Sequence, residues 1–263
     1  MIIDAHAHIF PDMISHKAVE GIHEFYNMNM ECKGTVDDLI EEGGKAGVDR
    51  YIVQSVATVP KQVTSINNFI AKCVKKYPDK LVGFAAMHPD FEGNIEDELD
   101  RVTKLGLRGV KLHSDFQKFC IDDEKAFPIY KVCEERGLPI LFHVGDSRYD
   151  YSSPERLFNI VKKFPKLVVI GAHFAGWSMW DRGAELFNHS GIYTDCSSSL
   201  YAMKPEHAVE LIRKIGVHRV MWGTDYPMWS AKEELERFDR LPLTNREREL
   251  VLSENVRRLL GEL

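Results

Sequence analysis

The sequence predicts one closed barrel of eight parallel strands with surrounding helices, an α/β fold of the (β/α)8 or TIM-barrel type, spanning residues 1–263 as a single domain. Eight apolar, β-branched runs alternate with segments of helical pattern, and the 263 residues are close to the roughly 250 that are typical of this fold. Most runs are continuous, as in Leu-Val-Val-Ile at 167–170, which suits parallel strands covered on both faces. No GxGxxG follows the first run, which argues against an open dinucleotide-binding sheet.

The eight runs set the expected order of the strands along the chain. A parallel strand cannot follow another directly, so each gap between runs must hold a crossover segment. The expected strands are Ile2–Ala5, Tyr51–Val56, Leu81–Met87, Gly109–His113, Pro139–Val144, Leu167–His173, Ile192–Cys196 and Arg219–Gly223.

Start signals mark several of the helices between these strands. Thr35, followed by two aspartates, is typical of a helix N-terminus, and Ser152-Ser153-Pro154 places a capping hydroxyl before a proline at the first helical position. Thr244-Asn-Arg-Glu247 is a capping box ahead of the last helix. The long connection Phe10–Gly34 is expected to be a loop with some helix that partly covers the pocket.

The composition of the chain limits the classes of molecule that it is expected to bind. The formal charge of −6 and the lack of a basic stripe argue against nucleic acid. The five cysteines include no CxxC pair, which favours a reducing, cytoplasmic location over a disulfide scaffold. No apolar stretch approaches the 18–20 residues, roughly, of a membrane span, and no signal-peptide pattern opens the chain. The expected partner is therefore a small-molecule substrate, with no nucleic acid and no membrane.

His6 and His8 are the most informative pair of residues. They belong to the first strand, where residues i and i+2 point to the same face with Cα atoms about 6.6–6.8 Å apart. This separation lets two imidazoles converge on one ion with Zn–N bonds of about 2.0–2.1 Å. Two half-buried polar residues that happen to alternate would be the alternative interpretation.

Three further polar residues fall at the ends of later strands. His143 closes the fifth strand, His173 closes the sixth, and Asp225 lies just past the eighth. Active-site groups of a barrel come from the C-terminal ends of its strands. Five such groups at one edge are hard to explain as packing, because burying them without partners would be costly.

Five motifs together resemble the amidohydrolase superfamily, in the branch that contains aminocarboxymuconate semialdehyde decarboxylase. The resemblance covers essentially the whole chain and says little about the substrate. The motifs are Asp4-Ala-His-Ala-His8, Gly109-Val-Lys-Leu-His113, Phe142-His-Val-Gly145, Gly171-Ala-His173 and Gly223-Thr-Asp-Tyr-Pro227.

The resemblance implies a role for each of the five strand-end residues. His6, His8 and His143 would be the imidazole ligands of one divalent ion, and Asp225 would be a carboxylate ligand that also serves in catalysis. His173 would be the free catalytic histidine. Zinc is the favoured ion because imidazole dominates the site, with manganese, cobalt or iron as alternatives. A homodimer is common in this branch, although nothing in the sequence requires one.

Four more residues are candidates for substrate binding. Lys111 and His113 share a face of the fourth strand. Related binuclear enzymes carboxylate a lysine at this place, but the resembled branch usually does not, so Lys111 is expected to be a substrate-binding or electrostatic group. His113 is either a pocket residue or a hydrogen-bonded residue at a strand end. Arg148 could meet a substrate carboxylate through two hydrogen bonds, and Trp177 could line an apolar wall. For Arg148 a solvated side chain, and for Trp177 simple packing at the rim, are the alternative interpretations.

Two reactions fit this site. The leading hypothesis is a hydrolase that uses a metal-activated water on an ester, lactone or amide of a small molecule. The alternative is a non-oxidative decarboxylase of an aromatic or unsaturated carboxylic acid, which a cationic group in the pocket would favour. A DNase is less favoured because the chain is acidic, and a non-catalytic barrel is less favoured because all five strand-end residues are present.

Overall fold

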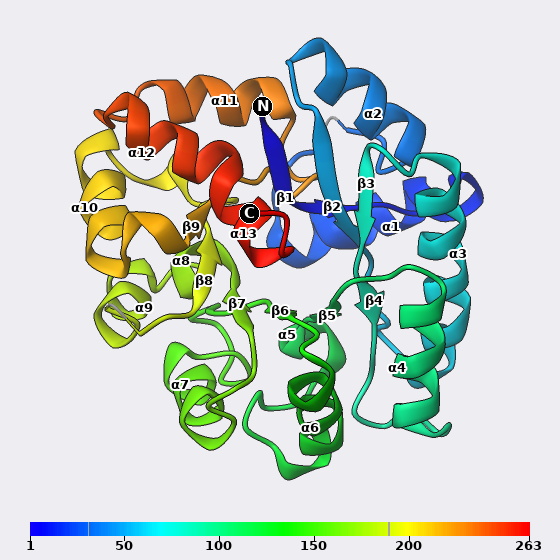
Figure 1. The fold of residues 1–263 in the computed structure, drawn as a ribbon. Helices are drawn as coiled ribbons and strands as arrows, with labels where there is room; N and C mark the ends of the chain where they lie inside the picture. The colour runs from blue at the N-terminus through cyan, green and yellow to red at the C-terminus, as the bar shows by residue number, and fades with distance from the viewer. Residues whose placement is uncertain (31, 189) are drawn as a thin grey trace.

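A computed structural model describes residues 1–30, 32–188 and 190–263, and it has the predicted parallel barrel. The strands form a ring with most helices outside it, and α13 (Asn255–Leu259) near the C-terminus lies across the middle of the ring in this view (Figure 1). The ring closes where Ala5 N donates to Trp222 O (2.9 Å) and His8 N donates to Tyr226 O (2.6 Å), which joins the first strand to the segment after the last. The strands are β1 (Ile3–His8), β2 (Arg50–Gln54), β3 (Leu81–Gly83), β4 (Ala85–Ala86), β5 (Val110–Leu112), β6 (Ile140–Phe142), β7 (Val169–Gly171), β8 (Tyr193–Asp195) and β9 (Val220–Met221).

These strands confirm the eight predicted runs, although most end one or two residues short of the predicted bounds. His113 and His143 therefore follow their strands directly, and His173 lies in the short element after β7 rather than on the strand. Two runs differ further. The run Leu81–Met87 is divided at Phe84 into β3, which pairs with β2, and β4, which pairs with β5. The first strand extends to His8 rather than ending at Ala5, because Ala7 and His8 also pair with β2, after a register shift between Asp4 and Ala7, and Ala7 bridges to Tyr226. His6 and His8 both lie on this strand, and their Nε2 atoms still converge to 3.2 Å.

The helices begin largely where the sequence predicts. Thr35 Oγ1 accepts from Asp38 N (3.3 Å), and Thr244 forms its capping box with Glu247. The prediction for Ser153 is wrong in one respect: α7 begins at Pro154, but the Ser153 side chain makes no capping hydrogen bond. The helices are α1 (Asp12–Tyr26), α2 (Val36–Lys45), α3 (Val63–Lys76), α4 (Ile95–Lys104), α5 (Ser114–Gln117), α6 (Phe127–Arg136), α7 (Pro154–Lys163), α8 (Ala172–Ala175), α9 (Trp180–Leu186), α10 (Pro205–Ile215), α11 (Ala231–Asp239), α12 (Asn245–Glu249) and α13 (Asn255–Leu259), with 3₁₀ turns at Pro60–Gln62, Glu124–Ala126, Leu200–Ala202 and Val217–Arg219 and a π turn at Leu250–Glu254.

The barrel interior is packed and is sealed at the end where the strands begin. Phe84 and Met221 belong to one buried cluster inside the ring, and Val256 and Leu260 from the C-terminal segment pack against it. Burying each of these apolar side chains contributes about 1.5–3 kcal/mol. Because this end is plugged, a ligand of the described barrel would enter at the C-terminal ends of the strands.

The connection Phe10–Gly34 contains more helix than expected. It holds α1, 15 residues long, of which only Ser15 is buried. No helix in the described part of the chain combines the length and apolarity needed to cross a bilayer.

A buried carboxyl on α11 makes stability depend on pH. Glu234 is fully buried, pairs with Arg237 through one oxygen and has no hydrogen-bond partner for the other. Burial raises the pKa of Glu234 from 4.5 to about 8. The folded protein then keeps a proton that the unfolded chain releases above pH 4.5, so we expect the free energy of unfolding to fall as pH rises from about 5 to about 8, by at most about 1.4 kcal/mol per pH unit.

Urea unfolding at pH 5.5 and pH 8 measures this fall in the free energy of unfolding. Glu234→Gln should reduce the difference between the two pH values, whereas Glu236→Gln, an exposed change on the same helix, should leave it unaltered. A pH dependence that is the same in wild type and Glu234→Gln would contradict the assignment.

Candidate metal centre

A cavity of about 660 Å³ opens at the C-terminal ends of the strands. Side chains of α1, among them Ile14, Ile22 and Phe25, form part of an apolar wall. Burial keeps the four histidines on the cavity floor neutral at pH 7. It lowers the pKa of His6 to about 4, and it lowers the pKa values of His8, His113 and His143 below the usual value of a histidine. The polar residues of the floor are His6, His8, Lys111, His113, His143 and Asp225.

His6, His8 and Asp225 form a close triangle of ligand atoms. The Nε2 atoms of His6 and His8 lie 3.2 Å apart. Asp225 Oδ1 is 3.3 Å from His6 Nε2 and 3.4 Å from His8 Nε2. Ligand atoms about 2.0–2.1 Å from one tetrahedral ion would be separated by roughly 3.3 Å. The triangle therefore has the size that a divalent metal ion requires.

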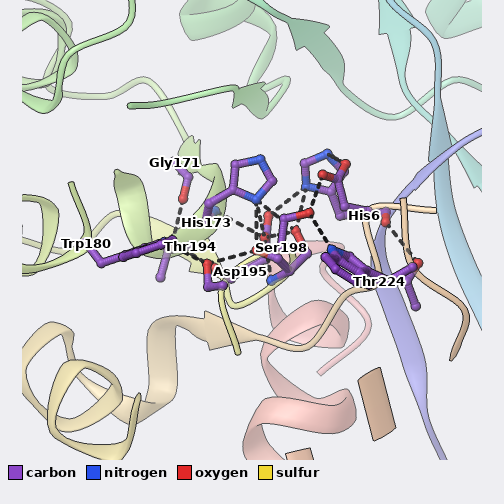
Figure 2. A network of polar contacts seen from close by, with 12 residues as sticks. His6, Gly171, His173, Trp180, Thr194, Asp195, Ser198 and Thr224 are labelled. Atoms are coloured by element: carbon purple, nitrogen blue, oxygen red, sulfur yellow. Dashed lines mark hydrogen bonds and ion pairs between the residues drawn. The ribbon is translucent and has the colours of Figure 1, made fainter. Parts of the chain in front are cut away.

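Asp195, a residue that the sequence analysis missed, orients His6 (Figure 2). Its Oδ2 accepts from His6 Nδ1 (3.0 Å), which leaves the lone pair of His6 on Nε2, facing the triangle. Its Oδ1 accepts from His173 N, Ser197 N and Ser197 Oγ. Burial alone would raise the pKa of Asp195, but His6 and Ser197 lower it to about 2. Asp195 lies at the end of the seventh predicted strand, Ile192–Cys196, which is β8 in the structure. A charged residue at a strand end was the signal that could have identified Asp195.

Asp225 is oriented by a partner on the neighbouring loop. Ser198 Oγ donates to Asp225 Oδ2 (2.7 Å), and Trp229 Nε1 donates to Ser198 Oγ (3.2 Å). These contacts turn Oδ1 toward His6 and His8. Both Asp225 and Ser198 have left-handed backbones, with φ of 57° and 46°. Backbones of this kind in non-glycine residues cost energy and cluster at functional sites.

His173 lies directly behind His6 on a left-handed turn. Its φ is 60°, and the next two residues have φ of 54° and 55°, each at a cost of about 1–2 kcal/mol. Its ring stacks on His6 with centroids 5.2 Å apart. Because Nδ1 donates to the Ser197 carbonyl (2.9 Å), Nε2 is the nitrogen that can gain or lose a proton. His173 does not itself line the cavity.

His143 lies beside the triangle rather than within it. Its ring stacks on His113 with centroids 3.9 Å apart and an interplanar angle of 5°, and Tyr26 Oη lies 3.0 Å from His113 Nε2. His143 Nε2 is buried without a hydrogen-bond partner and is 3.7 Å from Asp115 Oδ2. A buried nitrogen without a partner is costly, so this ring fits a role in holding an added group.

Lys111 is the buried cation of the site. It is 1% exposed, and its Nζ donates to His6 Nε2 (3.2 Å). Burial lowers the pKa of Lys111 to about 8. Lys111 and His113 both lie in the cavity, where their shared strand face predicts them.

Arg148 and Trp177 lie beside the cavity, and neither lines it. The Arg148 guanidinium donates to both oxygens of Asp146 (2.9 and 2.7 Å) and to Phe25 O (2.7 Å), so three of its five N–H groups are used within the protein. Trp177 packs edge-on against Tyr26 at 5.1 Å. These contacts tie α1 to the loop after β6, and they leave Lys111 as the cationic side chain at the cavity floor.

Asp4, which precedes His6, contacts the backbone of the site rather than an imidazole. It accepts from His6 N and Thr224 N (both 3.0 Å) and from Thr224 Oγ1 (2.6 Å). Its role is to join β1 to the segment that carries Asp225.

The barrel and this cluster define a TIM-barrel enzyme with groups able to hold a divalent metal ion at the open end of its strands. Neutral imidazoles, an ionised aspartate and an unpartnered histidine nitrogen all fit such an ion. The chain belongs to the amidohydrolase family, whose model matches residues 3–261.

One curated relative is similar to part of the chain. The chain is 29% identical over 79 residues to 2-amino-3-carboxymuconate-6-semialdehyde decarboxylase of Dictyostelium discoideum. This match spans 30% of the chain and only 22% of that protein's length.

Solved structures match along nearly the whole chain. A dihydroxybenzoic acid decarboxylase from a Polaromonas species, which contains bound manganese, has a TM-score of 0.75 at 16% identity, covering 99% of this chain and 96% of that one. A candidate 2-pyrone-4,6-dicarboxylic acid hydrolase from Pseudomonas putida has a TM-score of 0.69 at 19% identity, covering 99% and 97%. Other matches include further decarboxylases. At these identities the likenesses establish the fold.

Proposed function

We propose that this protein is a metal-dependent, non-oxidative decarboxylase of an aromatic or unsaturated carboxylic acid. The observation that carries the proposal is Lys111, a buried cation on the floor of a cavity with apolar walls. Such a cavity suits an anionic group on an apolar body. The curated relative and several matching structures are decarboxylases, which also supports this reaction over hydrolysis.

Hydrolysis, the leading hypothesis from the sequence, becomes the second candidate. The same ligand residues would serve it, and one matching structure is a candidate hydrolase.

In the proposed site, His6, His8, His143 and Asp225 hold one divalent ion, and His173 remains free. Zinc suits the imidazole-rich ligand set, and manganese is the competing choice, because the Polaromonas decarboxylase contains it. When bound, the ion would act as a Lewis acid that polarises a substrate oxygen.

The reaction requires one proton to replace carbon dioxide. The bond between the substrate carbon and its carboxyl group breaks, the electron pair stays on that carbon, and a proton joins it. Asp225 lines the cavity as an ionised carboxylate, and His173 behind His6 has a free lone pair on Nε2. We assign delivery of the proton to His173, which takes it from solvent at Nε2 and passes it to the substrate carbon, and we assign orientation of the reacting groups to Asp225.

Product analysis in ¹⁸O-labelled water tests the proposal. Protein loaded with zinc or manganese is incubated with 2,6-dihydroxybenzoate, 5-carboxyvanillate and 2-pyrone-4,6-dicarboxylate. Release of carbon dioxide with no ¹⁸O in the organic product supports a decarboxylase. Uptake of ¹⁸O without release of carbon dioxide would establish the hydrolase instead. Protein that binds neither metal would overturn both.

A further inference from the structure

Lys111 has a position that a purely structural lysine would not need. Its neighbours Val110 and Leu112 on β5 pack into the core between strands and helices, so the alternation of the strand turns Lys111 into the barrel mouth. The side chain is 1% exposed and lines the cavity floor. A charged ammonium in such a place normally has an anionic partner.

No described carboxylate forms an ion pair with Lys111. Asp195 and Asp225 act on it only at longer range, and among the described residues its side chain donates one hydrogen bond, to the neutral His6 Nε2 at 3.2 Å. Asp195 is already used by His6 Nδ1, His173 and Ser197. Lys111 therefore lies among carboxylates that are held by other groups.

The one acceptor of Lys111 is also the atom that the proposed metal ion needs. His6 Nε2 has a single lone pair, because Nδ1 carries the proton that Asp195 accepts. If the ion takes this lone pair, Lys111 loses its hydrogen bond and lies next to a second positive charge. An unpaired buried charge is strongly destabilising, and an anion beside both cations removes the penalty.

We propose that Lys111 is the counter-ion for a carboxylate or other anionic oxygen of the substrate, bound on the cavity floor beside the metal ion. This inference rests on the metal site of the proposed function. The apolar walls, which include Ile14, Phe25 and Phe69, accommodate the rest of the molecule, so the anionic group enters first and the apolar body follows it. The substrate class is accordingly an apolar molecule that carries an anionic oxygen, rather than a neutral ester or amide.

Binding measurements on Lys111→Met test this without any turnover. The change removes the charge and keeps an unbranched side chain. Calorimetric titration of zinc-loaded protein with benzoate and with neutral benzamide measures anion selectivity, and competition with a chelator measures zinc affinity. Lys17→Met, an exposed change at the cavity rim, is the control for loss of one positive charge.

In Lys111→Met, the affinity for benzoate should fall and the affinity for zinc should rise. Benzoate should bind about 10- to 100-fold more weakly, with benzamide binding unchanged, because a charge-assisted hydrogen bond is lost. Zinc should bind about 10-fold or more tightly, because a like charge is removed. Lys17→Met should change neither affinity by more than about twofold, since exposed charges are screened.

Other outcomes contradict the proposal. If zinc and benzoate both bind more weakly to Lys111→Met and to a second variant, Lys111→Gln, the lysine is structural or is itself part of the metal site. Unchanged benzoate affinity would also overturn it. Failure of the wild-type protein to bind zinc or manganese would instead refute the metal site of the proposed function, so the two failures can be told apart.

Discussion

His143→Ala is expected to lose the metal ion, whereas His173→Ala is expected to keep the ion and lose turnover. His143 has a buried nitrogen without a partner and lines the cavity, which suits a ligand. Removing a ligand should lower metal affinity by more than the roughly 10- to 100-fold that loss of a ligand's hydrogen-bond partner costs. His173 is held by Ser197 O and stacks behind His6, so its loss should reduce kcat about 10²- to 10⁴-fold with the metal still bound.

Metal content after dialysis and single-turnover rates measure the two effects. His207→Ala, on the exposed face of α10, is the matched control and should change neither. If both site variants retained full metal occupancy, the division of roles between His143 and His173 would be wrong.

Asp195→Asn is expected to weaken metal binding although Asp195 is not itself a proposed ligand. Asp195 Oδ1 accepts from three donors, so the amide nitrogen of an asparagine cannot occupy that position. The amide must then point its N–H groups at His6 Nδ1, which would force the proton of His6 onto Nε2 and block the lone pair that faces the triangle. We expect metal affinity to fall by about 10- to 100-fold or more.

Asp4→Asn is a demanding control for this experiment. Asp4 is equally buried but contacts the His6 backbone, and Thr224 Oγ1 can accept from an amide as readily as it donates to a carboxylate. Metal titration of both variants should therefore show a loss in Asp195→Asn and near wild-type affinity in Asp4→Asn. Equal losses would show that any change to a buried aspartate disrupts the site.

The sequence was sufficient for the barrel and for much of the polar floor of the cavity. Strand periodicity placed His6 and His8 on one face, and the short apolar runs placed His143, His173 and Asp225 at strand ends. These features depend on residues near one another in the chain, and every strand end of a parallel barrel opens at the same side. For the same reason Lys111 and His113 were correctly expected in the cavity.

Contacts between distant segments were decided only by the tertiary structure. Asp195 meets His6 across 189 positions of sequence, and nothing local to either residue marks the pair. Arg148 suggested a carboxylate clamp, but three of its five N–H groups bind Asp146 and the end of α1, and the buried Lys111 lies beside the triangle instead. Local pattern determines which face a side chain is on. The partners it finds there depend on how the ring closes and on which donors and acceptors that closure leaves unpaired.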